Sequence, residues 1–260
     1  MNSLPISAIV ITKNEEANIA RCLGSLNWVD EIILLDSGST DSTMKIAAQF
    51  NNVKCLTTEW LGYSATKQAA TDKSKNEWIL WVDADEVISD QLREEIIGLK
   101  SDNNHVAFEM PRKTFFMGQW VKHCGWYPGR VTRLFNKNSC RFNNKILHEG
   151  LDINGSTGRL KADILHYSYT SLYQYFDKMN YYGKFGAEEL VRKGRKFGWH
   201  QLIINPLHTF IKTYFFNKGI LDGTTGFIIS VGSSFSNFIK YVNFYYLSKE
   251  LNENNNKQNR

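Results

Sequence analysis

The sequence predicts an α/β fold: an open, mostly parallel sheet flanked by helices, with a helical C-terminal extension. Over the first hundred residues, apolar runs rich in β-branched residues alternate with segments whose apolar residues recur at helical spacing. This alternation is typical of a parallel sheet with helices on both faces. Beyond about residue 170, a helical pattern continues almost to the end of the chain.

The first strand and the first helix illustrate the two patterns. The run ISAIVIT (6–12) is continuously apolar, which indicates a strand buried on both faces. In the next segment, 14–26, Ile19, Leu23 and Leu26 recur at helical spacing. The elements expected up to residue 83 are then a strand (31–36), a helix opened by capping residues (39–50), a strand (53–56), a helix (64–73) and a strand (78–83).

The pattern changes after residue 100. The runs HVAFEM, RKTFFMG and RVTRLF predict a smaller mixed or antiparallel section. Helices are expected over 171–193, about 200–217 and 222–247. We therefore divide the chain into an α/β domain (1–168), a helical C-terminal region (169–250) and a polar tail (251–260) that we expect to be disordered.

The composition limits the class of protein. Hydrophobic residues make up 42% of the 260 residues, and the net charge of +5 is too small to indicate a nucleic-acid-binding protein. The four cysteines form no C-x-x-C pair, so we expect reduced thiols and a cytoplasmic protein. We find no signal-peptide pattern and no run of the roughly 20 apolar residues that cross a bilayer.

Polar side chains end three of the predicted strands: Thr12, Asp36 and Asp83. Because ligands bind beyond the carboxyl ends of strands in such sheets, we expect these residues to line one crevice. Asp83 belongs to WVDADEV, where Asp85 follows two residues later. Two carboxylates at this spacing suit a hard divalent cation, Mg²⁺ or Mn²⁺, which then binds phosphate. The alternative is a pair of surface acids in a loop.

Two classes of enzyme carry an Asp-x-Asp motif after a strand. In nucleotide-sugar glycosyltransferases the motif carries the metal, whereas in phosphohydrolases of the haloacid dehalogenase type it supplies an aspartyl nucleophile. That nucleophile normally ends the first strand, but three predicted strands precede Asp83, and no later acid pair of the pattern G-D-x-x-x-D occurs. The sequence therefore favours the glycosyltransferase.

Three motifs occur together in an order and spacing that closely resemble the family-two glycosyltransferases of the GT-A fold: AIVITKNEEANI (8–19), EIILLDSGSTDST (31–43) and WILWVDADEVIS (78–89). Three later stretches resemble the bacterial lipopolysaccharide core glucosyltransferase subgroup: HCGWYPGRVTRLF (123–135), LHEG (147–150) and GILDGTTGF (219–227). The resemblance implies a Rossmann-like nucleotide-sugar-binding and catalytic domain over 1–168. It also implies inverting transfer of a hexose, glucose from UDP-glucose, to a cell-envelope glycolipid such as lipopolysaccharide core.

The resemblance implies roles for residues at the first two strand ends. Thr12, Asn14 and Glu15 would line the nucleoside pocket, and Asp36 would help to hold the nucleoside together with Ser37. Broader members of the family have two consecutive acids where this chain has Asp36 and Ser37. The exact contact with the base therefore stays open.

Three more residues would act on the diphosphate and the metal. Lys67 falls where the family has a basic residue near the diphosphate, and a cation is chemically suited to phosphate; the alternative is an ordinary solvated lysine. Asp83 and Asp85 would contact the donor ribose and the metal, with Asp85 as the more direct ligand and a catalytic residue.

Displacement at the anomeric carbon requires a base that takes the proton of the acceptor hydroxyl. Many relatives have an aspartate after the WYP turn, where this chain has Gly129. Glu149, beside His148, is the nearest remaining acid and the candidate catalytic base. The alternatives are that the His148–Glu149 pair positions the acceptor or diphosphate, or that Glu149 only pairs with an arginine.

Two regions point to partners. Between Glu109 and Glu149 the chain carries cations and aromatic residues but no acid, which suits a phosphorylated saccharide or glycolipid acceptor rather than nucleic acid; the alternative is a solvated basic face. The basic stretch 191–200, next to aromatic-rich helices, suits peripheral contact with the inner face of the cell membrane, or a helical cap or homodimer interface. A rival of another class is a non-catalytic nucleotide-sugar-binding protein, favoured by Gly129 and opposed by the intact Asp-Ala-Asp.

Overall fold

The computed structural model describes residues 4–100, 104–143, 150–169 and 171–258, the last seven of these as backbone only. The chain forms two compact units. The first unit comprises Met1–Thr114 and Pro128–Tyr167, and the second comprises Phe115–Tyr127 and Ser168–Arg260. The segment 115–127, which the sequence groups with the α/β domain, thus packs with the C-terminal helices.

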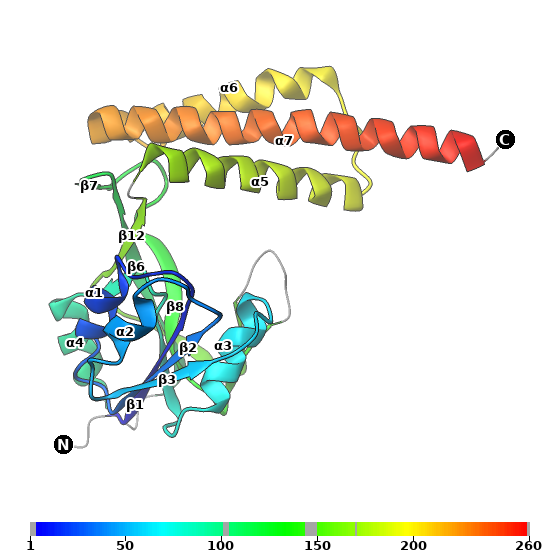
Figure 1. Cartoon of the computed structure of the whole chain (residues 1–260). Helices are drawn as coiled ribbons and strands as arrows, with labels where there is room; N and C mark the ends of the chain where they lie inside the picture. Colours follow the sequence, from blue (N-terminus) through cyan, green and yellow to red (C-terminus); the bar gives the residue numbers. More distant parts are fainter. Residues whose placement is uncertain (1–3, 101–103, 144–149, 170, 259–260) are drawn as a thin grey trace. The chain divides into compact units, whose positions relative to one another are not determined.

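The first unit is built on one mixed sheet, shown in Figure 1. Its parallel half has the order β3-β2-β1-β4, in which Thr12 lies opposite Asp36 in register. The strands of this half are β1 (Ile6–Thr12), β2 (Glu31–Asp36), β3 (Val53–Thr57) and β4 (Trp78–Trp81). The order then continues β8-β6-β12-β5, with β8 antiparallel to both β4 and β6.

The other strands are shorter or lie beyond the parallel half. They are β5 (Glu86–Ile88), β6 (His105–Phe116), β7 (Gln119–Trp120), β8 (Gly129–Asn136), β9 (Cys140–Phe142), β10 (Leu151–Ile153), β11 (Ser156–Arg159) and β12 (Ile164–Tyr169). β9 and β10 form a separate antiparallel pair. The predicted strands HVAFEM and RKTFFMG are one strand, β6, which continues through Pro111 with a register shift at Phe108/Glu109.

Helices cover both faces of the sheet, as predicted (Figure 1). Because successive side chains of a strand point to opposite faces of the sheet, β1 contributes residues to two hydrophobic cores, one on each face. Ala8 and Val10 pack in the core that holds α1 (Ile19–Gly24), α2 (Thr43–Ala47) and α4 (Asp90–Ile97). Ile9 packs in the core on the side of α3 (Tyr63–Asp72). All three of these strand residues are fully buried.

The two helices α1 and α2 are shorter than the predicted 14–26 and 39–50. The residues missing from their N-terminal ends form loops in which side chains bond to backbone N–H groups. Such bonds compete with helix formation, which is why Ser, Thr, Asn and Asp favour turns. The predicted capping residues 39–42 therefore belong to a loop, described below with the site, and α2 begins only at Thr43.

The second unit is helical. α5 (Leu172–Arg192) and α6 (Ile204–Ile211) both pack against α7 (Gly223–Gln258), as Figure 1 shows. In place of the predicted helix 200–217, the structure has the short helical turn η1 (Trp199–Leu202), then α6, then η2 (Lys212–Phe216); the turn η3 (Gly219–Asp222) follows before α7. Close approach of α5 to α7 requires small residues: a Cβ at Gly232 would lie 2.3 Å from Cε1 of Tyr175. Tyr175 also contacts Phe116, at 5.0 Å between ring centroids, which ties the segment 115–127 to this unit.

The C-terminus departs from expectation. We expect residues 251–260 to be disordered because they are polar, yet α7 continues to Gln258. Once a helix is nucleated and packed, each further residue adds one backbone hydrogen bond, so a polar sequence can extend it. Among the described helices, none is long and apolar enough to cross a membrane.

Candidate active site

The loops after β1 and β2 are joined by hydrogen bonds between their motif residues. The backbone N–H of Asn14 donates to Ser39 Oγ at 2.8 Å, and Asn14 Oδ1 accepts the N–H of Thr40 at 2.8 Å. The N–H of Glu15 donates to Thr43 Oγ1 at 2.8 Å. Asn14 has φ +56°, a left-handed conformation that asparagine tolerates better than most residues. Asn14 therefore shapes the edge of the site.

A second reciprocal pair binds the same two loops. Asp41 Oδ2 accepts the N–H of Glu16 at 3.2 Å, while Glu16 Oε2 accepts the N–H of Ser42 at 3.0 Å. The hydroxyl of Thr43 donates to Asp41 Oδ1 at 2.5 Å, and this bond is the main cause that lowers the pKa of Asp41. The acids of TKNEE and STDST thus hold the loops together.

Asp36 is buried at the end of β2, with 2% of its surface exposed. Its Oδ2 accepts the N–H groups of Gly38 at 3.0 Å and Ser39 at 2.9 Å, and its Oδ1 accepts the hydroxyl of Ser39. Gly38 has φ +88°, which a side chain would strain. The carboxylate therefore fixes its own turn, and its predicted contact with the nucleoside stays a prediction.

Several buried hydroxyls face no partner at this edge of the sheet. Thr12 Oγ1, Ser37 Oγ, Ser64 Oγ and Thr66 Oγ1 make no hydrogen bond within the part of the chain that the structure describes. Thr12 ends β1, Ser37 directly follows β2, and the other two lie in the first turn of α3. A buried polar atom left unpaired costs about 1–3 kcal/mol. All four lie on or directly after elements whose ends meet at the carboxyl edge of the parallel strands.

Asp83 lies just beyond β4 and contacts two cations. Its Oδ1 lies 3.2 Å from Lys67 Nζ, and its Oδ2 lies 2.6 Å from Arg133 Nη2. Trp81 donates its indole N–H to Oδ1 at 3.0 Å. Both cations also lie over the Trp81 ring, with Lys67 Nζ 4.0 Å and Arg133 Cζ 3.9 Å from its centroid. Both oxygens of Asp83 are thus occupied by groups of the chain.

Glu86 is the second acid of this cluster and is fully buried. Its Oε1 lies 2.6 Å from Arg133 Nη2 and 3.8 Å from Arg112 Nη1. Its Oε2 accepts the N–H of Asp83 at 3.1 Å. Three cations, Lys67, Arg112 and Arg133, therefore surround two carboxylates, which leaves a positive charge in the cluster.

The electrostatics of Asp83 follow from these contacts. Burial alone would raise the pKa of Asp83, but the charges of Arg133 and Lys67 outweigh burial and hold that pKa well below its usual range. Asp83 is therefore ionised at neutral pH. Lys67, with 1% of its side chain exposed, is a buried, paired lysine and not a solvated one.

Asp85 pairs with His166, which is not among the site residues predicted from the sequence. Asp85 Oδ2 lies 3.1 Å from His166 Nε2, and both side chains are partly exposed. His166 comes from β12, opposite Glu86 in register, and the N–H of Tyr167 donates to the Asp85 carbonyl at 2.9 Å. Among the described residues, no group of three or more His, Cys, Asp or Glu side chains converges on a metal position. A carboxylate and an imidazole nevertheless form a chemically suitable pair of ligands for a divalent cation whose other ligands come from the substrate.

Glu15 brings the loop after β1 to the same site. Burial raises the pKa of Glu15, a hydrogen bond from Asn18 lowers it, and the charge of Asp85 raises it further. The buried thiol of Cys22 lies 3.6 Å from the Asp83 carbonyl. The loop after β1, α1 and the Asp-Ala-Asp turn therefore meet.

Not every predicted residue is placed. Glu149 and His148 lie outside the described residues, so the role of Glu149 as base stays a prediction. Of the basic residues expected to face an acceptor, Arg133 is buried in the acid cluster, and Arg130 lies 3.9 Å from Glu109. These two arginines pair with acids of the same unit. The acids are distant from them in the sequence, so the pairs could not be predicted from it.

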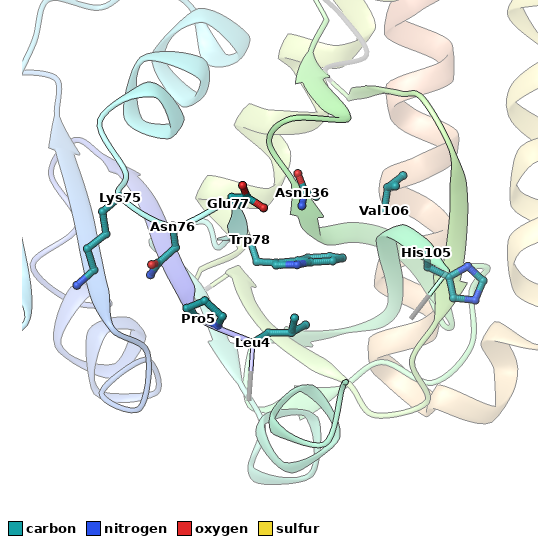
Figure 2. A pocket seen from close by; sticks show the side chains of 9 residues that line it. All are labelled: Leu4, Pro5, Lys75, Asn76, Glu77, Trp78, His105, Val106 and Asn136. Atoms are coloured by element: carbon teal, nitrogen blue, oxygen red, sulfur yellow. The ribbon is translucent and has the colours of Figure 1, made fainter. Parts of the chain in front are cut away.

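A pocket of about 480 Å³ lies elsewhere (Figure 2). It is lined by Leu4, Pro5, Lys75, Asn76, Glu77, Trp78, His105, Val106 and Asn136. These residues lie just before or at the starts of β1, β4 and β6, and at the end of β8. The pocket is therefore at the amino ends of the parallel strands and shares no residue with the site above.

Comparisons with known proteins agree with this geometry. The family model "Glycosyl transferase family 2" matches residues 7–153. The chain is 32% identical to an uncharacterized glycosyltransferase of Rickettsia typhi, over 94% of this chain and 87% of the relative. It is 28% identical to the lipopolysaccharide core biosynthesis glycosyltransferase LpsC of Rhizobium meliloti, over 93% of this chain and 92% of the relative.

A solved structure supports the fold. The mannosyltransferase PcManGT from Pyrobaculum calidifontis, in complex with GDP-Man and Mn²⁺, superposes with a TM-score of 0.59. It is 13% identical and covers 95% of this chain and 88% of its own. The fold is thus the GT-A fold that the resemblance implies. The chain therefore belongs to glycosyl transferase family 2, a family of enzymes that transfer sugars.

Proposed function

We propose that this glycosyltransferase is a metal-dependent, inverting hexosyltransferase that moves glucose from UDP-glucose to a cell-envelope glycolipid such as lipopolysaccharide core. The name of the Rhizobium meliloti relative supports the acceptor class. The complex of the Pyrobaculum enzyme with a nucleotide sugar and Mn²⁺ supports the donor class and the metal. Donor binding and catalysis belong to residues 1–168, and the acceptor or membrane faces residues 169–250.

The observation that carries the proposal is the arrangement at the carboxyl ends of β1, β2 and β4. Unpaired buried hydroxyls, a positively charged cluster and the Asp85–His166 pair lie on elements that meet at this edge. The hydroxyls of Thr12 and Ser37 suit a nucleoside, and the loop residues Asn14 and Glu15 border it. Asp36 holds the turn that presents Ser37.

Asp85 and His166 would hold the divalent cation, with Asp83 beside them. The cation supplies charge neutralisation at the leaving diphosphate. Carboxylate and imidazole together favour Mn²⁺ over Mg²⁺, because Mg²⁺ strongly prefers oxygen ligands. Asp83 is already paired with Lys67 and Arg133, which favours Asp85 as the direct ligand.

Lys67 and Arg133 would stabilise the departing UDP through the surplus positive charge of their cluster. Asp83 fixes the position of both cations, and both lie over the face of the Trp81 ring in cation–π contact. Oriented charges that need no rearrangement during reaction lower the barrier most effectively. This role does not require either cation to leave its carboxylate partner.

Inversion requires a base on the acceptor side, and we propose Glu149. It would accept the proton of the acceptor hydroxyl as the hydroxyl oxygen attacks the anomeric carbon and UDP leaves.

The four cysteines are free thiols, which supports a cytoplasmic location.

A UDP-release assay with the purified protein tests the proposal. The panel is UDP-glucose, UDP-galactose, UDP-N-acetylglucosamine and GDP-mannose, each with Mn²⁺, Mg²⁺ or EDTA. We expect release from UDP-glucose that Mn²⁺ supports and EDTA abolishes. Release from another sugar alone would overturn the donor assignment. Binding of UDP with no release, even with added lipopolysaccharide acceptor, would instead favour a non-catalytic nucleotide-sugar-binding protein.

A further inference from the structure

One face of the second unit exposes a stripe of large apolar side chains. From the N-cap of α6 to the end of η2, the large exposed apolar residues are Ile203, Ile204, Leu207, Ile211, Phe215 and Phe216, and we call them the apolar stripe. Their spacing of i, i+1, i+4 and i+8 places the four aliphatic residues within about 100° of helix circumference. On the opposite side, Pro206 and Thr213 are buried. The stripe is therefore the outer face of an amphipathic helix.

The stripe is larger than the apolar patches of ordinary protein surfaces. Its six side chains are between 37 and 79% exposed. Large apolar side chains present on the order of 200 Å² each, so the stripe presents roughly 700 Å². The largest apolar patch on a typical monomer is about 300–600 Å², and larger patches mark interaction sites. Ile220 and Leu221, in η3, add further exposed apolar surface.

The surroundings of the stripe are positively charged. Between Leu190 and Ser248 the chain has seven lysines and arginines and a single acid, Asp222, while Lys193 pairs at 2.6 Å with Glu189 just outside this range. That acid is buried and lies 2.8 Å from His123 Nδ1, so it does not neutralise the surface. Lys212 and Lys218 are exposed on the same segment as the stripe. The segment of the stripe thus combines apolar surface with two exposed lysines.

We propose that the apolar stripe binds an anionic lipid bilayer surface, with the helix α6 and the turn η2 lying in the interface. An amphipathic helix with lysines at its border and aromatic residues at its apolar face inserts its side chains at the level of the headgroups, and basic residues attract anionic lipids. No described helix is long and apolar enough to cross the bilayer. The stripe thus lies on the membrane.

Charge complementarity favours a bilayer over a second copy of this chain. A symmetric dimer places the same surface on both sides of its interface. Such an interface would place the exposed Lys212 and Lys218 of one copy against a segment, residues 190–248, that offers no exposed acid to pair with them. An anionic bilayer supplies both the apolar interior and the negative charge.

Vesicle sedimentation tests this inference, which does not depend on the donor sugar. The full chain is mixed with vesicles of phosphatidylcholine alone, or with about one third phosphatidylglycerol. We expect binding to the anionic vesicles that weakens at high salt. The double variant Phe215→Ser, Phe216→Ser should bind at least about tenfold more weakly, since two exposed aromatic residues no longer insert.

Two controls separate the stripe from other exposed groups. Tyr173→Ser in α5 removes an aromatic residue that is 77% exposed, close to the 79% of Phe216, and should leave vesicle binding unchanged. Lys212→Glu should weaken binding to anionic vesicles, whereas Lys184→Glu, an exposed lysine of α5, should weaken it less.

Equal binding of the double variant and the native chain would overturn the proposal. So would a native chain that ignores vesicles but forms dimers, in sedimentation velocity, that the double variant does not form. UDP release without vesicles should be the same in the double variant as in the native chain. A loss of that release would indicate misfolding, which circular dichroism checks.

Discussion

Arg133 is the residue on which the buried part of the site depends most. It bridges Asp83 and Glu86 at 2.6 Å to each, and 2% of its surface is exposed. Replacing it with methionine keeps the side-chain length but leaves the fully buried Glu86 with Arg112 at 3.8 Å as its one cation among the described residues. Breaking a buried ion pair in this way costs about 3–5 kcal/mol.

This cost is a large fraction of the 5–15 kcal/mol that stabilises a typical domain. Urea unfolding of the native chain and of Arg133→Met measures it. The matched control is Arg130→Met on the same strand, β8. Arg130 pairs with Glu109 at 3.9 Å, and both are partly exposed, so its loss should cost at most about 1 kcal/mol. Equal destabilisation by the two variants would refute the reasoning.

The same comparison has a pH dependence of known sign. The folded-state pKa of Asp83 lies well below its unfolded value, so its contribution to stability is complete at neutral pH. That contribution is lost as the pH falls below about 4, toward the folded pKa. The gap in free energy of unfolding between native chain and Arg133→Met should therefore narrow below about pH 4. A gap that widens on acidification would contradict the charge pairing.

Two other substitutions give sharp expectations. Lys67→Met removes one of the two cations that contact Asp83. We expect a roughly 10²-fold lower rate of UDP release, because one preorganised charge at the diphosphate is lost. Steady-state kinetics that match those of the native chain would contradict this. Gly232→Ala places a Cβ 2.3 Å from the buried Tyr175 ring and should destabilise the helical unit by about 1–3 kcal/mol in urea titration. Gly24→Ala, where no atom lies within 4 Å of the new Cβ, is its matched control and should be close to neutral.

The parallel half of the sheet could be predicted because its signal is local. Continuous apolar runs set β1, β2 and β4, and polar residues directly after them mark the carboxyl edge. Thr12 and Asp36 end β1 and β2 opposite each other, as predicted, whereas Asp83 lies two residues beyond the end of β4 at Trp81. That the three residues line one crevice stays a prediction. The family could be predicted for the same reason, because the resemblance depends on the order and spacing of motifs along the chain.

The partners of the two motif aspartates could not be predicted in this way. Arg133 is 50 residues from Asp83, and His166 is 81 residues from Asp85. Each comes from a strand of the antiparallel half of the sheet, whose pairing follows from tertiary packing rather than from local pattern. We interpreted the arginine-rich interval between Glu109 and Glu149 as an acceptor surface. The acids that neutralise Arg112 and Arg133 lie earlier in the chain, so the sequence of the interval does not reveal them.

Local polar residues were also misleading in two places. The segment STDST has the pattern of a helix start, yet Asp41 and Thr43 hold the loop of Glu15 and Glu16 and delay the helix. The polar tail has the composition of a disordered segment, yet α7 continues into it as far as Gln258. In the first case hydrogen bonds between two loops override the local preference, and in the second the propagation of a helix that has already formed does so.

The central claim is that Asp85 and His166 hold a divalent cation. Calorimetric titration of Mn²⁺ into the full chain saturated with UDP tests it directly, in the native chain and in Asp85→Ala and His166→Ala. We predict that each variant binds Mn²⁺ at least tenfold more weakly, while Asp152→Ala, an exposed acid on β10, binds as the native chain does. Unchanged Mn²⁺ affinity in Asp85→Ala would contradict the claim and remove the metal from this site.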